Sequence, residues 1–316
     1  MIIDSFMFND ELDILELRLG QLEKSVDYFV FNEMRTTHSG KSKPLYYLDN
    51  KEKFSRWGSK IIHGIFERGP GGSWELETAQ RADLQRLVMS LNPRGEDTLS
   101  TSDCDEIPNP EVLLSYTPSM GLRNLKQFTY WYNFNHLMDY GSRSSSRARL
   151  GTVQNMHDAG GLGNFHGGPK DDMDPNFPFI DKAGWHCSYF SEGLERVRRK
   201  VNSFAHDDLS PFINGRTDKQ LADDIYNGRN IYHLIGVGGS KLVPILPETH
   251  PPYVLENMER FKMFTNQNFY DKHKALLQEP DTGAGIVLYP ARIPRPLVAA
   301  SLPRRANAPV RPLTRR

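Results

Sequence analysis

The chain has 316 residues, of which 38% are hydrophobic and 25% charged, and its formal net charge at pH 7 is +0. This composition is ordinary for a globular protein of one or two domains, and it disfavours a dedicated nucleic-acid-binding protein, which would carry a basic surplus. The only cysteines are Cys104 and Cys187, so no disulfide framework is predicted. Because the sequence shows neither a signal-peptide pattern nor a run of about 20 apolar residues, we expect a cytoplasmic protein without a membrane span.

The first third of the sequence alternates strand-like and helical patterns. Residues 1–8, 26–32 and 60–66 are apolar or aromatic runs of strand length. Leucines recur at helical spacing over residues 12–22, between the first two runs. Residues 74–91 follow as a longer amphipathic helix. The order strand, helix, strand, loop, strand, helix predicts an α/β fold with a mostly parallel sheet.

The most informative segment is the run L-S-T-S-D-C-D-E-I-P over residues 99–108. Asp103 and Asp105 are two positions apart, so in an extended or tightly turning backbone their carboxylates point to the same side. Carboxylate oxygens are the ligands that Mg²⁺ and Mn²⁺ prefer, and substrate phosphates commonly complete such sites. Pro108 biases Ile107 toward an extended conformation, which predicts a strand end opening onto a ligand-binding loop. The competing interpretation is a solvated acidic turn.

The middle of the chain carries a second informative segment. Residues 126–137 are densely aromatic and predict a core strand. In the run A-G-W-H-C-S-Y-F over residues 183–190, His186 is either a buried core histidine or a group that binds metal, diphosphate or acceptor. Residues 192–204 predict a basic amphipathic helix, whose cations either are solvated or meet phosphate.

Two segments differ in composition from the rest. Residues 141–174 are rich in serine and arginine and then in glycine, and we expect a mobile insert there, within a main domain of residues 1–285. Residues 286–316 contain abundant arginine and proline and no acidic residue, which predicts a disordered basic tail.

Several of these segments, in this order, resemble glycosyltransferase family 17, which includes β-1,4-mannosyl-glycoprotein β-1,4-N-acetylglucosaminyltransferase. The matching segments are residues 4–13, 26–33, 60–63, 74–81, 102–108, 183–190 and 203–206. The D-x-D-E-I-P and G-W-H-C-S segments are specific as a pair. The resemblance implies a GT-A-like single domain with a central, mostly parallel, Rossmann-like sheet flanked by helices. It also implies a UDP-sugar donor, a divalent cation (Mn²⁺ or Mg²⁺) and inverting transfer, with GlcNAc as the expected sugar.

The roles of individual residues follow as hypotheses. Asp105 is the expected direct metal ligand, Asp103 acts through water or touches the ribose, and His186 or His206 completes the shell. Inverting transfer needs a base for the acceptor hydroxyl, on the face of the sugar opposite the diphosphate. The candidates, between which the sequence does not choose, are Asp181, Glu192, Asp207 and Asp208. Residues expected to face the nucleotide are Asn9, Asp10, Glu11, Glu33 and Arg81.

Other functions stay open at this point. The same acids would suit a metal-dependent phosphohydrolase or nuclease, although such sites commonly need two metals about 3.5–4 Å apart and the chain offers one tight acidic cluster. A non-catalytic glycan-binding protein would also explain the aromatic richness. The acceptor is equally open between a glycoprotein glycan and a lipid-linked, lipopolysaccharide or capsule glycan.

Overall fold

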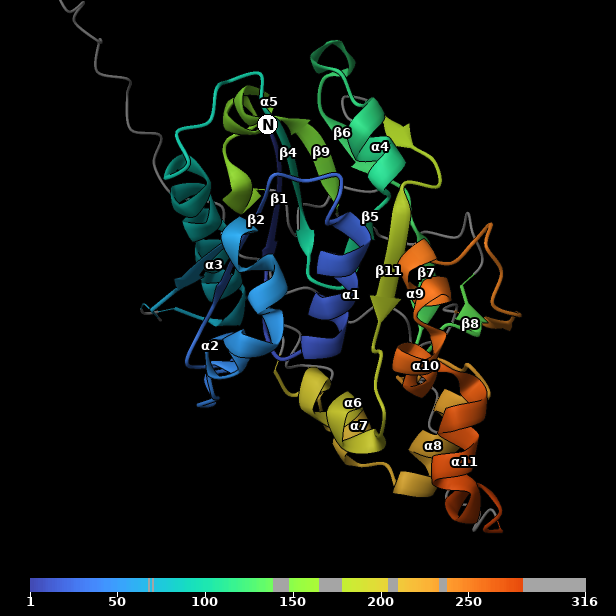
Figure 1. Ribbon diagram of the computed structural model, residues 1–316. Coiled ribbons are helices and arrows are strands. Elements are labelled where there is room, and N and C mark those ends of the chain that lie inside the picture. Colours follow the sequence, from blue (N-terminus) through green and yellow to red (C-terminus); the bar gives the residue numbers. More distant parts are fainter. Residues whose placement is uncertain are drawn as a thin grey trace, which may run out of the picture.

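Two β-sheets organise the computed structural model, which describes residues 1–67, 69, 71–138, 148–164, 178–203, 210–232 and 238–280 (Figure 1). The strands are β1 (Ile2–Met7), β2 (Tyr28–Glu33), β3 (Ile61–Ile65), β4 (Thr98–Asp103), β5 (Glu106–Pro108), β6 (Arg123–Leu125), β7 (Phe128–Trp131), β8 (His136–Leu137), β9 (Arg149–Thr152), β10 (Phe179–Ile180), β11 (Gly184–Ser188) and β12 (Lys241–Leu242). The α-helices are α1 (Leu12–Leu22), α2 (Tyr46–Asn50), α3 (Ser73–Met89), α4 (Pro110–Ser115), α5 (Val153–Asp158), α6 (Leu194–Val201), α7 (Ser210–Asn214), α8 (Asp218–Tyr226), α9 (Pro252–Glu256), α10 (Met258–Phe261) and α11 (Asn266–Leu277). Short 3₁₀ helices are η1 (Lys51–Lys60), η2 (Pro118–Met120), η3 (Leu162–Asn164) and η5 (Lys262–Phe264).

The larger sheet has the strand order β10-β6-β9-β4-β1-β2-β3. Strands β4, β1, β2 and β3 run parallel to one another, while β9 pairs antiparallel with β4 and β6. The chain therefore builds outward from β1 in one direction through β2 and β3, and in the other direction through β4. This reversal of strand order lies between β1 and β4, and open α/β sheets bind ligands outside the carboxyl ends of the strands at such a point. The predicted α/β class with a central, mostly parallel sheet is confirmed.

The smaller sheet has the order β12-β8-β7-β11-β5. The chain passes from the larger sheet to the smaller one between β4 and β5, through a two-residue turn at Cys104 and Asp105. The acidic segment singled out from the sequence is thus the junction of the two sheets. The aromatic run 126–137 is not one strand as predicted: Tyr132, at φ 66°, follows β7, and the chain then turns back into β8.

Helices cover both faces of the larger sheet, because successive residues of its central strands point to opposite faces. Phe29 and Phe31 of β2 belong to the core that includes Leu15 of α1. Val30, between them, packs in a separate cluster with Leu84 of α3. Figure 1 shows α1 and α2 on one side of the sheet and α3 on the other.

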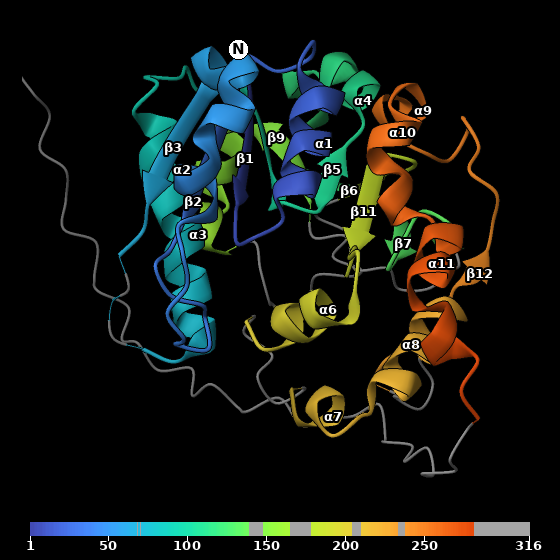
Figure 2. The ribbon, with the colours of Figure 1, turned by 60° about the horizontal axis from the view of Figure 1, so that its bottom comes forward.

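A second, smaller core lies beyond the arrowhead of β11, where Figures 1 and 2 both place α6. Leu194, Val197 and Val201 form the buried face of α6 and pack with α7, α8 and α11. The amphipathic helix expected over 192–204 is therefore present, with its cations on the other faces. No helix among the described residues has the length and apolar character needed to cross a membrane.

Part of the segment expected to be an insert belongs to the central sheet. Residues 148–164 form β9, α5 and η3, and β9 pairs with β4 over four residues. The remainder of the segment, and the expected basic tail of residues 286–316, lie outside the described residues.

Candidate active site

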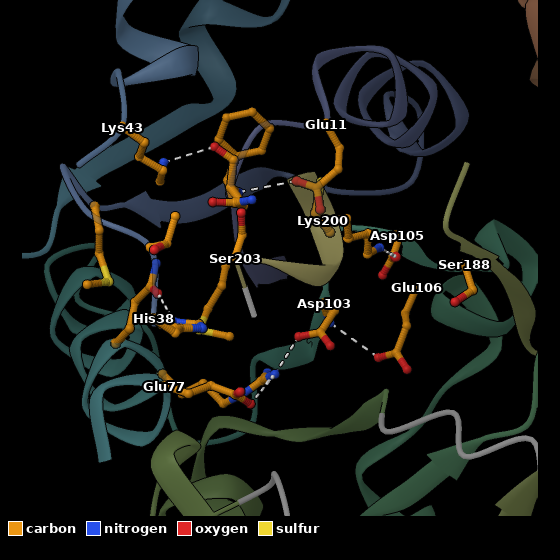
Figure 3. A pocket seen from close by; sticks show the side chains of 18 of the residues that line it. Glu11, His38, Lys43, Glu77, Asp103, Asp105, Glu106, Ser188, Lys200 and Ser203 are labelled. Carbon is orange, nitrogen blue, oxygen red and sulfur yellow. Dashed lines mark hydrogen bonds and ion pairs between the residues drawn. The ribbon is translucent and has the colours of Figure 1, made fainter. Parts of the chain in front are cut away.

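A cavity of ≈ 290 Å³ lies at the carboxyl ends of β1 and β4, the point where the strand order reverses (Figure 3). Its walls come from the loop after β1, residues 34–43 after β2, one face of α3, the turn between β4 and β5, the end of β11, and α6. These elements are far apart in the sequence and meet only because the parallel strands end at the same edge of the sheet.

The two aspartates predicted to bind metal both line this cavity, but each has its own basic partner. The Asp103 carboxylate accepts a hydrogen bond from Nη2 of Arg81, which also lies 3.4 Å from Oε1 of Glu77. Oδ2 of Asp105 lies 2.5 Å from Nζ of Lys200, and its Oδ1 lies 3.8 Å from Nε2 of His186. The structure thus brings Asp103, Asp105, Arg81 and His186 together at one cavity.

The shape of the acidic turn is set by Arg18, which the sequence interpretation missed. Its guanidinium, with 0% of the residue exposed, bridges to Asp4 through two hydrogen bonds of 2.7 Å and donates to Oγ of Ser102 at 2.7 Å. Its Nη1 donates to the backbone carbonyls of Asp103 (2.7 Å), Cys104 (3.1 Å) and Glu106 (3.1 Å).

A signal for Arg18 was present in the sequence. The residue follows Leu15 by three positions and precedes Leu22 by four, so the helical pattern places it on the apolar face of α1. An arginine is almost never fully buried unless it is paired. A charge at such a position therefore predicts a buried acidic partner, although it does not say which one.

On the side of the cavity next to α6, the ammonium of Lys200 lies among carboxylates. Burial by itself would lower the pKa of Lys200, but the carboxylates of Asp105 and Glu11 outweigh it and raise that pKa well above its usual value. Burial, together with neighbouring Asp10, raises the pKa of Glu11, and Lys200 opposes this shift. Nζ of Lys43, which also lines the cavity, donates to the carbonyl of Asn9 at 3.0 Å. Acids and cations thus alternate around one cavity, which suits an anionic ligand that binds together with a cation.

The residues predicted to face the nucleotide divide into two groups. Asn9, Glu11 and Arg81 line the cavity. Asp10 instead pairs with Arg199, its Oδ2 lying 2.6 Å from Nε, and so connects the loop after β1 to α6.

Glu33 ends β2 but points into the protein, with 0% of the residue exposed. Its carboxylate accepts hydrogen bonds from the backbone N–H groups of Tyr47 (3.2 Å) and Leu48 (3.0 Å) and lies 3.1 Å from Nε2 of His63. An acceptor at the first turn of a helix satisfies donors that the helix cannot satisfy itself. Glu33 therefore caps α2 and does not line the cavity.

The two base candidates that the structure describes lie away from the cavity. Asp181 is exposed and lies 3.5 Å from Nζ of Lys126, and Glu192 is exposed and lies 3.8 Å from Nζ of Lys272. Neither lines the cavity. His206, Asp207 and Asp208 fall outside the described residues.

The carboxylates that do line the cavity, besides the two aspartates, are Glu11, Glu77 and Glu106. Glu106 directly follows the D-x-D sequence and accepts the N–H of Asp103 at 3.2 Å through Oε2. Glu77 precedes Arg81 by one helical turn, and this spacing alone predicts only a surface pair. In the folded chain both members of that pair are buried at the cavity wall.

Comparison with models of protein families assigns the chain to one family. It belongs to glycosyltransferase family 17, whose model matches residues 1–263. The chain is thus a member of a transferase family that acts on a sugar donor and a glycan acceptor. A search of curated protein sequences gives no match.

Solved structures with a similar arrangement include 4-diphosphocytidyl-2C-methyl-D-erythritol synthase, with 12% identity, a TM-score of 0.29, and coverage of 50% of this chain and 78% of that one. Another is the inositol-1-phosphate CTP transferase from T. maritima, with 13% identity, a TM-score of 0.32, and coverage of 58% and 86% respectively. At these TM-scores the likeness carries no argument about function.

Proposed function

We propose that the chain transfers a sugar, GlcNAc in our hypothesis, from a UDP-sugar to a hydroxyl of a glycan acceptor with inversion at the anomeric carbon. The observation that supports this most directly is the cavity at the point of strand reversal. It combines Asp103 and Asp105 with the cations of Arg81 and Lys200, in a member of glycosyltransferase family 17.

The residues present suit a divalent cation whose coordination shell is completed by the substrate. Among the residues that the structure describes, no three His, Cys, Asp or Glu side chains are grouped as a metal site. Mg²⁺ bound together with substrate phosphates needs only one or two carboxylates from the protein. Asp103 and Asp105 supply two, with His186 beside the second. A cation bound there would act as a Lewis acid that neutralises charge developing on the leaving diphosphate.

The chain's own groups have separate tasks in this proposal. Arg81 and Lys200 stabilise the diphosphate as the bond from the anomeric carbon to its oxygen breaks and that oxygen keeps the electron pair. The acceptor oxygen forms the new bond to the anomeric carbon from the opposite face and loses its proton to a base. Two carboxylates of the cavity wall, Glu11 and Glu106, are the bases that we propose to compare. For the true base, replacement by glutamine lowers kcat and leaves the donor KM nearly unchanged.

Calorimetry tests the donor site directly. UDP, UDP-GlcNAc and UDP-glucose are titrated into the protein with Mn²⁺ and again with EDTA. We expect Mn²⁺-dependent UDP binding that is lost in Asp105→Ala and kept in Asp181→Ala, a matched control because Asp181 is an exposed aspartate away from the cavity. If no nucleoside diphosphate binds under either condition, the transferase proposal is wrong, and hydrolysis of phosphodiesters becomes the next activity to assay.

A further inference from the structure

The contact between Lys200 and Asp105 places a cation of the protein on a carboxylate expected to hold a metal. The two charged atoms are 2.5 Å apart, and the side chains of Lys200 and Asp105 are only 23% and 8% exposed. The ring of Tyr189 lies beside the ammonium, with its centroid 5.4 Å from Nζ. In Figure 3 the dashed line between Lys200 and Asp105 lies at the edge of the cavity, on the same side as Glu11.

The position of Lys200 is set by its helix as well as by its partner. Val197 and Val201 anchor α6 in the smaller core. Arg199 pairs with Asp10 at 2.6 Å, and Arg196 lies 3.4 Å from Asp13. These contacts tie α6 to the loop after β1 and to α1. The backbone of Lys200 is therefore held within reach of Asp105 by contacts that do not involve Asp105 itself.

We propose that Lys200 occupies Asp105 in the absence of donor and so prevents a divalent cation from binding there alone. An ammonium and a divalent ion on one carboxylate repel each other, and the repulsion is stronger at a partly buried site than in water. A diphosphate brings negative oxygens that accept the ammonium and the metal at the same time. Cation and nucleotide then bind together or not at all. This second part rests on the proposed function, whereas the competition at Asp105 does not.

Binding of Mn²⁺ alone, followed by the electron paramagnetic resonance of free Mn²⁺, tests the competition without any turnover. The variant is Lys200→Met, which keeps most of the length of the unbranched side chain and removes its charge. The control is Lys219→Met on α8. Nζ of Lys219 forms a similar pair with Oδ2 of Asp223, at a distance of 2.7 Å, and neither residue lines the cavity. We expect Mn²⁺ to bind Lys200→Met at least about tenfold more tightly than the wild type or the control, and the gain to vanish in Lys200→Met with Asp105→Asn.

Removing the ammonium leaves the Asp105 carboxylate without this partner, so the variant is also followed by thermal unfolding. A ligand that binds the folded state raises its Tm. Mn²⁺ should therefore raise the Tm of Lys200→Met more than that of the wild type. Lys200→Gln, which retains a hydrogen-bond donor, provides a second variant with the same expected direction.

The outcomes separate this inference from the proposed function. Equal Mn²⁺ affinity in the wild type and Lys200→Met, or tight Mn²⁺ binding by the wild type without nucleotide, overturns the inference. If Lys200→Met gains Mn²⁺ affinity but no UDP-sugar binds to any variant, the competition stands and the proposed function is wrong. If the wild type binds UDP with Mn²⁺ while Lys200→Met gains nothing, the proposed function stands and the inference is wrong.

Discussion

The buried pair of Arg18 and Asp4 provides a test of how the acidic turn is held. In Arg18→Met the Asp4 carboxyl group loses both of its 2.7 Å hydrogen bonds from the guanidinium, in a site where 0% of Asp4 is exposed. Breaking a buried pair by removing one partner costs about 3–5 kcal/mol. Because whole domains are stable by only about 5–15 kcal/mol, we expect the midpoint of urea unfolding to fall strongly. The slope of the unfolding free energy against urea concentration should not change.

The double variant Asp4→Leu with Arg18→Met separates charge from packing. Replacing a buried ion pair by apolar residues of similar volume is often neutral or stabilising, so the double variant should recover much of the stability lost in Arg18→Met. It still lacks the donor to the carbonyls of Asp103 and Glu106, and we therefore expect a folded protein with weakened UDP binding. Arg86→Met, which alters an exposed arginine of α3, is the control and should leave both properties unchanged. A loss below about 1 kcal/mol in Arg18→Met, within the range of exposed pairs, would refute the reasoning.

Three further predictions concern the elements around the site. Gly184→Ala should destabilise the protein by at least about 1–3 kcal/mol in urea unfolding, because Gly184 has φ 141° and an added Cβ would lie 2.1 Å from the carbonyl oxygen of Ile107; an unchanged midpoint would contradict the β5–β11 contact. Phe31→Ala should cost about 3–5 kcal/mol, since the ring is fully buried and stacks on Phe6 at 5.0 Å between centroids; a cost near that of a surface substitution would contradict this packing. Burial lowers the pKa of His250, whose Nε2 donates to the carbonyl of Phe134 at 2.8 Å. The neutral imidazole therefore contributes stability that is present above the unfolded pKa of about 6.5 and is lost as the pH falls through the folded pKa. Unfolding followed from about pH 7.5 to about pH 5.5 should show this fall, and His250→Gln should flatten it; an equally steep fall in the variant would assign the effect to other groups.

Local patterns predicted much of the central sheet. The helical leucine repeat predicted residues 12–22, the exact bounds of α1, and the apolar runs around it correspond to β1 and β2. The alternation of strand and helix also predicted the parallel order, because each crossover must return the chain to the same edge. No helix was expected over residues 46–60, which form α2 and η1. The cap of α2 is Glu33, a residue of another element, so no local signal marks where this helix begins.

The sequence by itself predicted three groups of the candidate site, and the strand end beside which the two aspartates stand. Asp103, Asp105 and His186 were recognisable because their spacing and neighbours are local properties of the chain. Only the tertiary structure decided their partners. Lys200 reaches Asp105 across 95 positions, and Arg18 reaches the carbonyl of Asp103 across 85. Periodicity describes contacts within one helix or strand. Such pairings instead depend on how separate elements pack, and that packing is decided by the hydrophobic clusters that join the elements.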